Sequence, residues 1–444
     1  MKKILVLGAG RSASSLIKYL LDNSAALDWQ VTIADISIEV AMQKTANNPR
    51  AAAVLFDVQD AAKVSELVKE HSLVISLLPA TMHYSVAVEC IKQKKHLVTA
   101  SYVSKEMGAL DREAKRNGVL LLNEIGLDPG IDHMSAMKII DACKQEGEEI
   151  ISFKSYCGGL IAPESNNNPW GYKFTWNPRN VVLAGQGTAK YIENGKYHYK
   201  PYSRVFKDIE TISVEEHGTF DGYANRDSLS YRKVYGLETI PTMLRGTLRM
   251  PGFCEAWNVF VQLGLTDDSY SIENAENLTY AELIEALLPS HLKGNSVKEK
   301  LCNFLNIQPD STVSKKIEWL DLFSDKKINI PNATPAMALQ ALLEGKWKLM
   351  PHDKDMIVLQ HLFSVKKRDG KLKTITSSLV VLGEDQTYTA MAKTVGLPAA
   401  IAAKLILQGV IKATGVQIPT HKEIYEPVLK ELEEFGVVFS EKEI

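Results

Sequence analysis

Cysteine is scarce in this sequence, and its distribution argues against two classes of site. The five cysteines are an odd number, lie far apart and include no Cys-x-x-Cys pair; they are Cys90, Cys143, Cys157, Cys254 and Cys302. A disulfide framework or a zinc site needs paired or closely spaced cysteines. We therefore expect reduced thiols, a reducing compartment and no metal site.

Long apolar runs and an excess of charge are also missing. The sequence has no stretch of about 18 uninterrupted apolar residues, the length that a membrane span requires. The apolar start Met1–Leu7 is broken by Gly8, Gly10 and Arg11, too early for a secretory signal. The net charge of −2 gives no reason to expect nucleic acid or an anionic membrane as a partner. We expect a cytoplasmic protein.

The chain is long enough for two or three domains. Its 444 residues exceed what one hydrophobic core usually supports. In the first part of the chain, short apolar runs alternate with helical patterns, which is typical of a parallel sheet covered by helices on both faces. This pattern predicts an α/β fold that begins with a Rossmann-type doubly wound parallel sheet. We expect strands at Lys3–Leu7, Gln30–Ala34, Ala53–Phe56, Leu73–Leu78, His96–Ala100 and Val119–Asn123, and helices at Ser14–Asp22, Ala61–Glu70, Tyr84–Lys92 and Lys105–Asn117.

The rest of the chain changes pattern several times. A helical pattern at Asp132–Gln145 is followed, up to about Gly264, by strand-like segments rich in Gly, Asn and Tyr, which indicate a mixed or antiparallel sheet. Helical periods then dominate, strand alternation resumes near Asp355, and Ala390–Ile411 forms an Ala-rich helical run. We expect a dinucleotide-binding Rossmann domain at 1–130 and 385–444, an α/β substrate-binding and dimerisation domain at 131–264 and 350–384, and a helical subdomain at 265–349.

The loop after the first expected strand has the pattern Gly-x-Gly-x-x-Ala, from Gly8 to Ala13. Gly8 permits a tight turn, Gly10 lets backbone N–H groups approach a pyrophosphate, and small Ala13 allows close helix packing. The positive end of the helix dipole would attract the anion. A purely structural glycine turn is the alternative. Because the loop follows a strand and opens a helix, we predict cofactor contacts at Gly8, Ala9, Gly10, Arg11 and Ser12.

Asp35 ends the second expected strand, 25 residues after Gly10. A carboxylate there can accept hydrogen bonds from the adenosine ribose hydroxyls, which favours NAD. A 2′-phosphate would meet a like charge, at a cost of up to about 4 kcal/mol per unit charge. Neither Arg nor Lys follows directly, since the next residues are Ile36, Ser37 and Ile38. We predict NAD as cofactor, with NADP possible; a solvated strand end is the alternative for Asp35.

Polar residues also follow the fourth and fifth expected strands. Leu78 and the segment Ala100-Ser101-Tyr102 end these strands, whose carboxyl ends face the nicotinamide side of a doubly wound sheet. Ser101 and Tyr102 thus lie where cofactor and substrate would meet. As single residues, a turn hydroxyl and a core aromatic are the alternatives.

Asp128 is the main candidate in the next segment. It precedes Pro129 and Gly130, which hold its backbone in an extended or turn conformation, so its carboxylate can accept an amine. An Asx-turn at a helix entrance is the alternative. We interpret Asp132 as the N-cap of the following helix. We interpret His133 as a first-turn helical residue rather than a general base.

Arginines stand beside turn residues further along the chain. Arg226, Arg245 and Arg249 offer planar guanidinium groups suited to carboxylates, so a carboxylate-rich substrate is a plausible ligand, although surface charges are the alternative. The aromatic segment Trp170–Trp176 is interpreted as strand and core, and a place lining the cleft is the alternative. Cys157 is interpreted as a buried packing thiol, because no histidine partner is evident.

Many segments in one order resemble the saccharopine dehydrogenases of the glutamate-forming kind, also called saccharopine reductases. They include GAG, VISLLP, VTASYVS, NEIGLDPGIDHM, SYCGGLIAPES, NPWGYKFTW, NRDS, LRGTLRMPGF and MAKTVGLPAA. The resemblance implies a Rossmann domain, an α/β substrate domain with a helical insertion, and a homodimer. It also implies cofactor contacts at the Gly8–Gly10 turn, Asp35, Leu78, Ala100 and Ser101, and saccharopine contacts at Ser101, Tyr102, Asp128, Arg226, Thr247, Leu248 and Arg249.

The resemblance implies a reaction as well. Saccharopine, which is lysine and glutamate joined through a secondary amine, would react with NAD and water to give L-glutamate and 2-aminoadipate 6-semialdehyde, or the reverse. Asp128 and Tyr102 are the predicted catalytic residues, and whether Asp128 transfers a proton stays open. In this family an arginine at the place of Asp35 goes with NADP and an aspartate with NAD.

Two other functions remain as alternatives. One is a related reductase that joins another amine and aldehyde, such as carboxynorspermidine dehydrogenase; the arginine-bearing segments argue against it. The other is a protein that binds NAD as a sensor or scaffold without turnover. The full set Ser101, Tyr102, Asp128 and Arg226 disfavours this, because a sensor does not need a substrate site.

Overall fold

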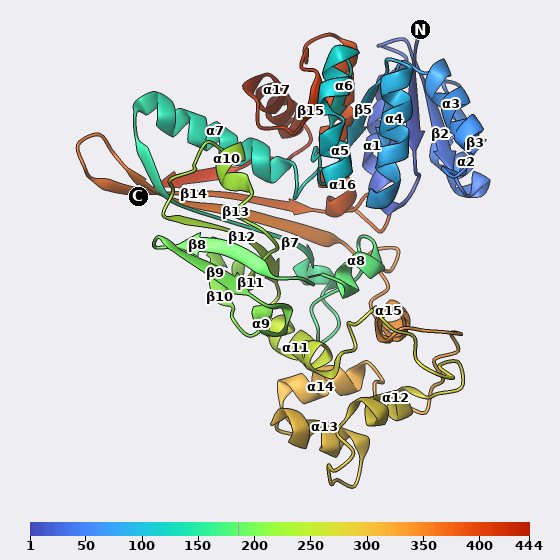
Figure 1. The fold of residues 1–444 in the computed structure, drawn as a ribbon, viewed down its shortest axis with the longest axis vertical. Coiled ribbons are helices and arrows are strands. Elements are labelled where there is room, and N and C mark those ends of the chain that lie inside the picture. The colour runs from blue at the N-terminus through green and yellow to red at the C-terminus, as the bar shows by residue number, and fades with distance from the viewer. Residues whose placement is uncertain (185) are drawn as a thin grey trace.

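The computed structural model describes residues 1–184 and 186–444. Figure 1 shows the first domain at the upper right, a second sheet with long strands beside it, and a group of helices at the bottom. The N-terminus lies in the first domain, whereas the C-terminus lies at the second sheet (Figure 1).

The first sheet is parallel throughout its described strands. Seven strands follow the order β15-β6-β5-β4-β1-β2-β3. In strand β1, Ile4 and Val6 belong to one buried core, and Leu5 and Leu7 to another. Apolar side chains on both faces are what a sheet covered by helices on both sides requires. The Rossmann-type doubly wound fold is thus confirmed. The strands are β1 Lys2–Leu7, β2 Trp29–Asp35, β3 Ala51–Leu55, β4 Leu73–Ser76, β5 His96–Thr99, β6 Leu120–Leu122 and β15 Gly415–Gln417.

The helices of this domain include one that the sequence pattern did not predict. Helix α2 begins after Ser37, whose hydroxyl accepts a hydrogen bond from the N–H of Val40. Only Ala41 within it is buried, so it has no apolar stripe to reveal it. The helices are α1 Ser14–Ser24, α2 Ile38–Thr45, α3 Ala61–Glu70, α4 His83–Lys92, α5 Lys105–Ala109, α6 Asp111–Arg116, α16 Ala390–Leu407 and α17 Lys422–Glu433.

Helix α16 is the predicted Ala-rich run. Within the described residues it is the one helix long and apolar enough to cross a membrane, but 78% of it is buried inside the protein. It packs on α1, β4 and β5 of the first domain, and on β13 of the second sheet. It is therefore a core helix that connects the two domains.

The second sheet is mixed, as expected. Its central strand β7 pairs in parallel with β12 and antiparallel with β13. Helix α7 (Ile131–Glu146) lies against this sheet (Figure 1), and the hairpin β8–β9 belongs to the sheet through the pairing of β8 with β12. The strands are β7 Glu149–Ile161, β8 Ala189–Glu193, β9 Lys196–Lys200, β10 Glu210–Val214, β11 Gly218–Ala224, β12 Thr242–Arg249, β13 Asp355–Lys366, β14 Leu372–Leu382 and β16 Ser440–Glu443.

One part of the predicted domain division needs correction. Strand β16 pairs with β14, so the end of the segment 385–444 belongs to the second sheet and not to the first domain. Four of its residues form this edge pairing, from Ser440 to Glu443. All four are exposed and polar, so the sequence gives no apolar signal for the strand.

The helical region surrounds an aromatic core. Trp170, Tyr172 and Phe174 are buried against Trp257 and Trp347. The expectation of a strand at 170–176 is wrong, because these residues form no strand, although they do lie in the core. The helices here are α11 Phe253–Leu263, α12 Tyr280–Leu287, α13 Val297–Leu305, α14 Thr312–Trp319 and α15 Pro335–Lys346, with short helices α8 Pro178–Val182, α9 Tyr202–Val205 and α10 Tyr231–Val234 elsewhere in the second domain.

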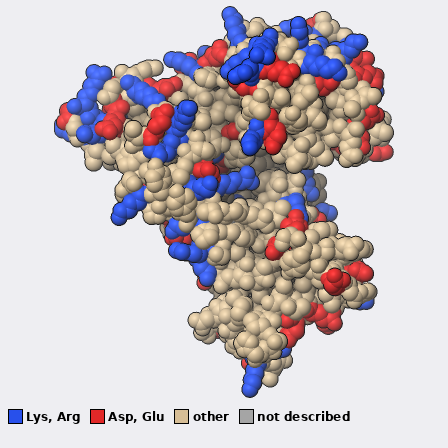
Figure 2. All heavy atoms as spheres, viewed as in Figure 1, with Lys and Arg blue, Asp and Glu red and all other residues tan. Residues whose placement is uncertain are grey.

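The carboxyl edge of the first sheet faces the second domain. The loop after β1 contacts the aromatic segment, because Nη1 of Arg11 donates to the carbonyl oxygen of Phe174 at 3.3 Å. Figure 2 shows a hollow between the first domain above and the helical region below. In open α/β sheets this edge is where ligands bind.

Candidate active site

The loop after β1 has the shape of a dinucleotide-binding turn. Gly8 has a φ of +96°, and a Cβ there would lie 3.1 Å from the carbonyl oxygen of Leu77, so a side chain would be both strained and crowded. A Cβ on Gly10 would meet no atom within 4 Å, which leaves open space beside the loop. Ala13 is buried in the core beneath α1. These features fit a pyrophosphate that approaches the backbone near Gly10.

Asp35 is held beside this loop. Its Oδ2 accepts from the N–H of Ala9 at 2.7 Å and its Oδ1 accepts from the N–H of Ser37 at 3.0 Å. The carboxylate is therefore fixed at the end of β2, next to the glycine turn. Arg11 is exposed and contacts the second domain, whereas Ser12 is half-buried at the start of the helical segment.

The ends of β4 and β5 lie side by side, as their pairing requires. Leu78, Ala100 and Ser101 are half-buried there. A Cβ on Gly126 would lie 2.9 Å from the Cβ of Ala100. The turn that carries Asp128 thus packs directly against the end of β5, and the two predicted halves of the site meet at this point.

Asp128 lies between a tyrosine and an arginine. Its Oδ1 accepts from the hydroxyl of Tyr102 at 3.2 Å and from Nη2 of Arg245 at 2.6 Å. The same Nη2 of Arg245 also donates to Oδ2 of Asp132 at 2.6 Å. Arg245 and Asp132 are buried, and Tyr102 and Asp128 are half-buried. The carboxylate of Asp128 is directed at side chains of other segments, and no Asx-turn bond from it is present in the described residues.

The pKa values of the two carboxyl groups in this cluster are shifted in opposite directions. Burial raises the pKa of Asp128 and outweighs the opposing charge of Arg245. For Asp132, burial again favours the neutral form, but His133, Arg245 and the N–H of Gly130 outweigh it and lower its pKa. Paired carboxyl groups with diverging pKa values are typical of sites where one group carries a proton and the other a charge.

Two sequence expectations are corrected here. Asp132 is not the N-cap of α7, because Gly130 takes that position and Asp132 accepts from its N–H at 2.6 Å. Arg245, expected to face substrate carboxylates, is already paired with Asp128 and Asp132. The pairing of Arg245 is hidden from sequence inspection, because Asp128 and Asp132 lie 117 and 113 residues away from it.

A second buried network adjoins the first. Glu124 accepts from the N–H of Val103 at 3.0 Å and from the hydroxyl of Tyr231 at 3.1 Å. Nε2 of His133 lies 2.9 Å from Oε2 of Glu124, the same oxygen that accepts from Tyr231, and Nδ1 of His133 lies 2.5 Å from the hydroxyl of Tyr235. His133 is thus a fully buried member of a polar network. Sequence reasoning missed Glu124, although a lone carboxylate directly after the strand β6 was a usable signal.

Arg249 is a buried cation that has no carboxylate partner among the described residues. Nη1 donates to the carbonyl oxygen of Leu248 at 3.2 Å, and Nε has no hydrogen-bond partner in the described chain. Its guanidinium carbon lies 5.3 Å from the ring centroid of Tyr172 and 5.4 Å from that of Phe253. Buried charges are normally paired, so this side chain has capacity for an anionic ligand.

The remaining predicted substrate residues are placed as follows. The guanidinium carbon of Arg226 lies 5.4 Å from the ring centroid of Tyr102, and its backbone has a φ of +43°. Thr247 is half-buried. Leu248 packs its side chain into the core of the opposite sheet face, so only its backbone can face a ligand beside Arg249. Cys157 is buried, which raises its pKa far above the ordinary value, and it lies within the electrostatic range of Asp128, Arg245 and Arg249.

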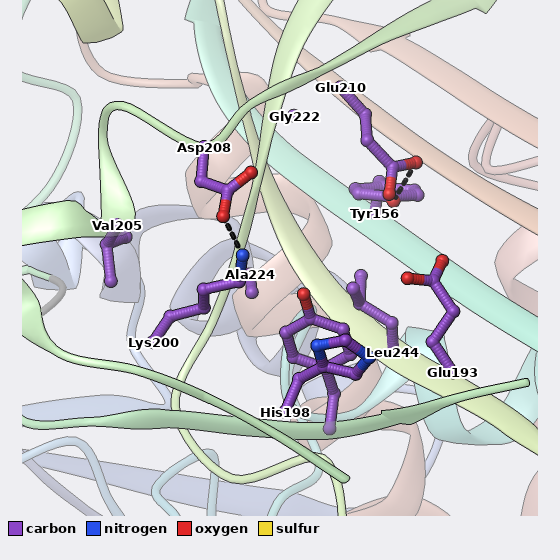
Figure 3. Close-up of a pocket in the computed structure, with 11 residues that line it drawn as sticks. Tyr156, Glu193, His198, Lys200, Val205, Asp208, Glu210, Gly222, Ala224 and Leu244 are labelled. Atoms are coloured by element: carbon purple, nitrogen blue, oxygen red, sulfur yellow. Dashed lines mark hydrogen bonds and ion pairs between the residues drawn. The ribbon is translucent and has the colours of Figure 1, made fainter. Parts of the chain in front are cut away.

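Figure 3 shows a different cavity, of about 160 Å³, in the second domain. It is lined by charged side chains that pair with one another or with a neighbour: Lys200 with Asp208, and Glu193 and Glu210 with Lys154. None of the predicted site residues lines it. It therefore does not belong to the cluster around Asp128. Among residues 1–184 and 186–444, no group of His, Cys, Asp and Glu side chains could hold a metal ion.

Two family models match the chain. One, described as "Saccharopine dehydrogenase NADP binding domain", matches residues 4–122, and the other, "Saccharopine dehydrogenase C-terminal domain", matches residues 126–437. A solved structure, the apo histidine-tagged saccharopine dehydrogenase (L-Glu forming) from Saccharomyces cerevisiae, superposes with a TM-score of 0.90 at 35% identity and covers 100% of both chains. A homospermidine synthase from Legionella pneumophila, with a TM-score of 0.59 at 10% identity, shares the fold.

Curated relatives fall into two groups. Saccharopine dehydrogenase [NADP(+), L-glutamate-forming] of Pyricularia oryzae is 36% identical, over 99% of each chain. The mitochondrial alpha-aminoadipic semialdehyde synthase of Mus musculus is 37% identical, over 99% of this chain but 47% of its own length. The chain thus spans nearly the whole fungal protein and about half of the mammalian one.

Proposed function

The chain belongs to the saccharopine dehydrogenase family, and on that basis we propose that it oxidises saccharopine with NAD and water to L-glutamate and 2-aminoadipate 6-semialdehyde, or catalyses the reverse. It is an oxidoreductase of the saccharopine dehydrogenase type that uses a nicotinamide dinucleotide. The preference for NAD, the substrate contacts and the catalytic roles are the finer parts of the proposal.

The observation that carries the substrate proposal is the complementarity of two buried clusters. Arg249 is a buried cation without a carboxylate partner in the described chain. Asp128, Asp132 and Glu124 are buried carboxylates that share mainly Arg245 and His133 as neighbours. A ligand with carboxylates and an amine would complete both clusters, because each of its charges meets an opposite one. Saccharopine has three carboxylates, a secondary amine and an α-amino group.

The roles of the residues follow from their contacts. Arg226 and Arg249 would bind carboxylates, and Asp128 would accept a hydrogen bond from an amine of the substrate. Arg245 holds Asp128 in place, and Tyr102 donates to it. Because burial raises the pKa of Asp128, its carboxyl group can hold a proton more readily than an exposed aspartate. Asp128 is therefore our candidate for holding the proton that the substrate amine must lose.

The cofactor would lie along the glycine loop. Gly8, Ala9 and Gly10 would approach its pyrophosphate, Leu78, Ala100 and Ser101 its nicotinamide end, and Asp35 its adenosine ribose. When bound, the nicotinamide supplies a hydride acceptor. Fungal relatives are named for NADP(+). We nevertheless propose NAD for this chain, because the Asp35 carboxylate is fixed where a 2′-phosphate would meet a like charge.

One assay tests these proposals. Protein mixed with saccharopine and NAD should form reduced cofactor, followed by its absorbance, and NADP should give a kcat/KM at least about tenfold lower. Absence of turnover with either cofactor would refute the activity. A faster reaction with NADP would refute the cofactor preference alone. The Asp35→Asn variant should narrow the difference between the cofactors, since it removes the charge and keeps an acceptor.

We also propose a homodimer and a cytoplasmic location. The resemblance to the family supports the dimer, and the five buried, unpaired cysteines are compatible with a reducing compartment. Analytical ultracentrifugation tests the dimer, and fluorescence microscopy of a tagged chain in its own cell tests the location.

A further inference from the structure

A histidine at the edge of the first sheet, which the proposed function does not use, contacts a group of hydroxyls. His83 is the first residue of α4 and is 3% exposed. Its Nδ1 lies 2.9 Å from Oγ of Ser76, and its Nε2 lies 2.8 Å from Oγ of Ser101 and 3.3 Å from Oγ1 of Thr99. The imidazole therefore connects the ends of β4 and β5.

The hydroxyls in contact with His83 differ in exposure. Ser76 and Thr99 end neighbouring strands and are fully buried, with 0% and 1% exposure. Ser101 is half-buried, and its N–H donates to Oγ1 of Thr99 at 3.3 Å. Only the Ser101 end of this group therefore reaches toward the site where cofactor and substrate are proposed to meet.

The imidazole is suited to fixing a hydroxyl and not to carrying charge. Burial lowers the pKa of His83 to about 4, so the ring is neutral at physiological pH. A neutral imidazole has one donor nitrogen and one acceptor nitrogen. Whichever nitrogen carries the hydrogen decides whether the Ser101 hydroxyl points its own hydrogen toward the ring or into the cleft.

We propose that His83 is a positioning residue that fixes the direction of the Ser101 hydroxyl at the junction of cofactor and substrate. The proposal rests on the proposed function in that Ser101 is taken to contact the ligands. Without a fixed partner, the serine hydroxyl would rotate and its hydrogen would point in several directions. A buried partner restricts it to one direction before the ligand binds, which is the kind of support that precise sites require.

Two substitutions test the contacts of the two ring nitrogens separately. The side-chain amide of Asn can replace Nδ1 of histidine, whereas the longer Gln can replace Nε2. His83→Asn keeps the contact with Ser76 and loses the one with Ser101; we expect kcat/KM for saccharopine to fall about fivefold to tenfold, the size of one lost hydrogen bond. His83→Gln keeps the reach to Ser101, and we expect less than about a twofold loss.

A second buried histidine, at the end of α3 and in contact with the same sheet, provides a matched control. Nδ1 of His71 lies 2.5 Å from the carbonyl oxygen of Leu67, and Nε2 lies 2.7 Å from Oγ1 of Thr32, with 2% exposure. His71→Asn should destabilise the domain to a degree similar to His83→Asn and leave kcat/KM unchanged. Equal kinetic losses in the two Asn variants would overturn the proposal, since the effect would then come from general loss of stability.

The pathway through Ser101 is tested by combining variants. If His83 acts through Ser101, adding His83→Asn to Ser101→Ala should lower kcat/KM no further than Ser101→Ala alone. Losses that multiply would overturn the proposal. If wild-type protein turns over saccharopine with neither cofactor, the proposed function fails, and the same variants are then compared by NADH fluorescence titration. A weaker Kd in His83→Asn and Ser101→Ala, but not in His71→Asn, would uphold the inference; unchanged Kd values would overturn it.

Discussion

Asp132 and Asp355 are both buried carboxylates, but they lie in different regions and have different partners. Asp132 lies in the cleft cluster and pairs with Arg245. Asp355 lies where β13 meets α16, and its two oxygens accept from the N–H groups of Ala390 at 2.6 Å and Met391 at 2.9 Å. The pKa of Asp132 is lowered: burial opposes ionisation, but neighbouring positive charges outweigh it. The pKa of Asp355 is raised to about 6, because burial outweighs its backbone donors.

The difference shows what backbone N–H groups and arginine side chains each do for a buried carboxylate. Backbone N–H groups satisfy the hydrogen bonds of a buried carboxylate but compensate its charge only in part. An arginine compensates the charge and fixes the geometry as well. In the cleft, Arg245 together with His133 thus favours the ionised form of Asp132, whereas Asp355 at the domain junction has only backbone donors. Substitutions that remove these carboxylates or their partners one at a time test this difference.

The largest effect is expected from Arg245→Met. This change leaves Asp128 and Asp132 buried beside each other without their shared counter-charge, and removing one partner of a buried ion pair costs about 3–5 kcal/mol. We expect that loss in the free energy of unfolding, measured by urea denaturation. Asp128→Asn added to Arg245→Met should restore part of the stability. Arg249→Met is the matched control, because no carboxylate in the described chain depends on Arg249. Equal losses in the two arginine variants would contradict the comparison.

The next effect is a difference in pH dependence. Asp355 binds its proton more tightly in the folded protein than in the unfolded chain, so its contribution to stability is present at low pH and is lost as pH rises through about 6. Relative to Asp355→Asn, the wild-type protein should lose up to about 3 kcal/mol between pH 4 and pH 7. Asp132, with a lowered pKa, should show the opposite sign: its contribution is present at neutral pH and is lost on acidification. The measurement is urea denaturation of wild type, Asp355→Asn and Asp132→Asn from pH 7 down to about pH 3, because the lowered pKa of Asp132 places its loss of stability below the ordinary value near 4. Parallel slopes for the two variants would refute the expected difference.

A smaller effect concerns the cleft alone. Arg249→Met should lower kcat/KM for saccharopine by about 1.5–3 kcal/mol of binding free energy, or roughly tenfold to a hundredfold, because a charge-assisted hydrogen bond to a carboxylate is lost. The Kd for NADH, measured by fluorescence, should not change, since Arg249 lies in the second domain. Arg112→Met, at an exposed position, is the control. A weaker Kd for NADH would place Arg249 in the cofactor site instead.

The first domain and the cluster around Arg245 differ in how far the sequence reveals them. The strands β1–β6 and the glycine loop were predictable because the signal is local: apolar runs, a turn pattern and Asp35 at a fixed spacing. The partners of Arg245 were not, since Asp132 lies 113 residues away and either residue fits an ordinary role by itself. Tyr231 is 107 residues from Glu124, so only the fold brings them together. Short polar elements such as α2 were missed because they bury almost nothing.

The smallest expected effect tests the contact between the cofactor loop of the first domain and the aromatic segment of the second domain. Arg11 is exposed in the cofactor loop, and the one hydrogen bond of its side chain in the described chain joins that loop to the carbonyl oxygen of Phe174 at 3.3 Å. Arg11→Ala removes one long, solvent-accessible bond, so we expect less than about 1 kcal/mol of lost stability by urea denaturation. It also removes a positive charge near the proposed pyrophosphate position, which should raise the KM for NAD about twofold to fivefold with kcat unchanged. A large fall in kcat instead would mean that this contact sets the alignment of the two domains, and the cleft would then depend on the loop far more than its weak bond suggests.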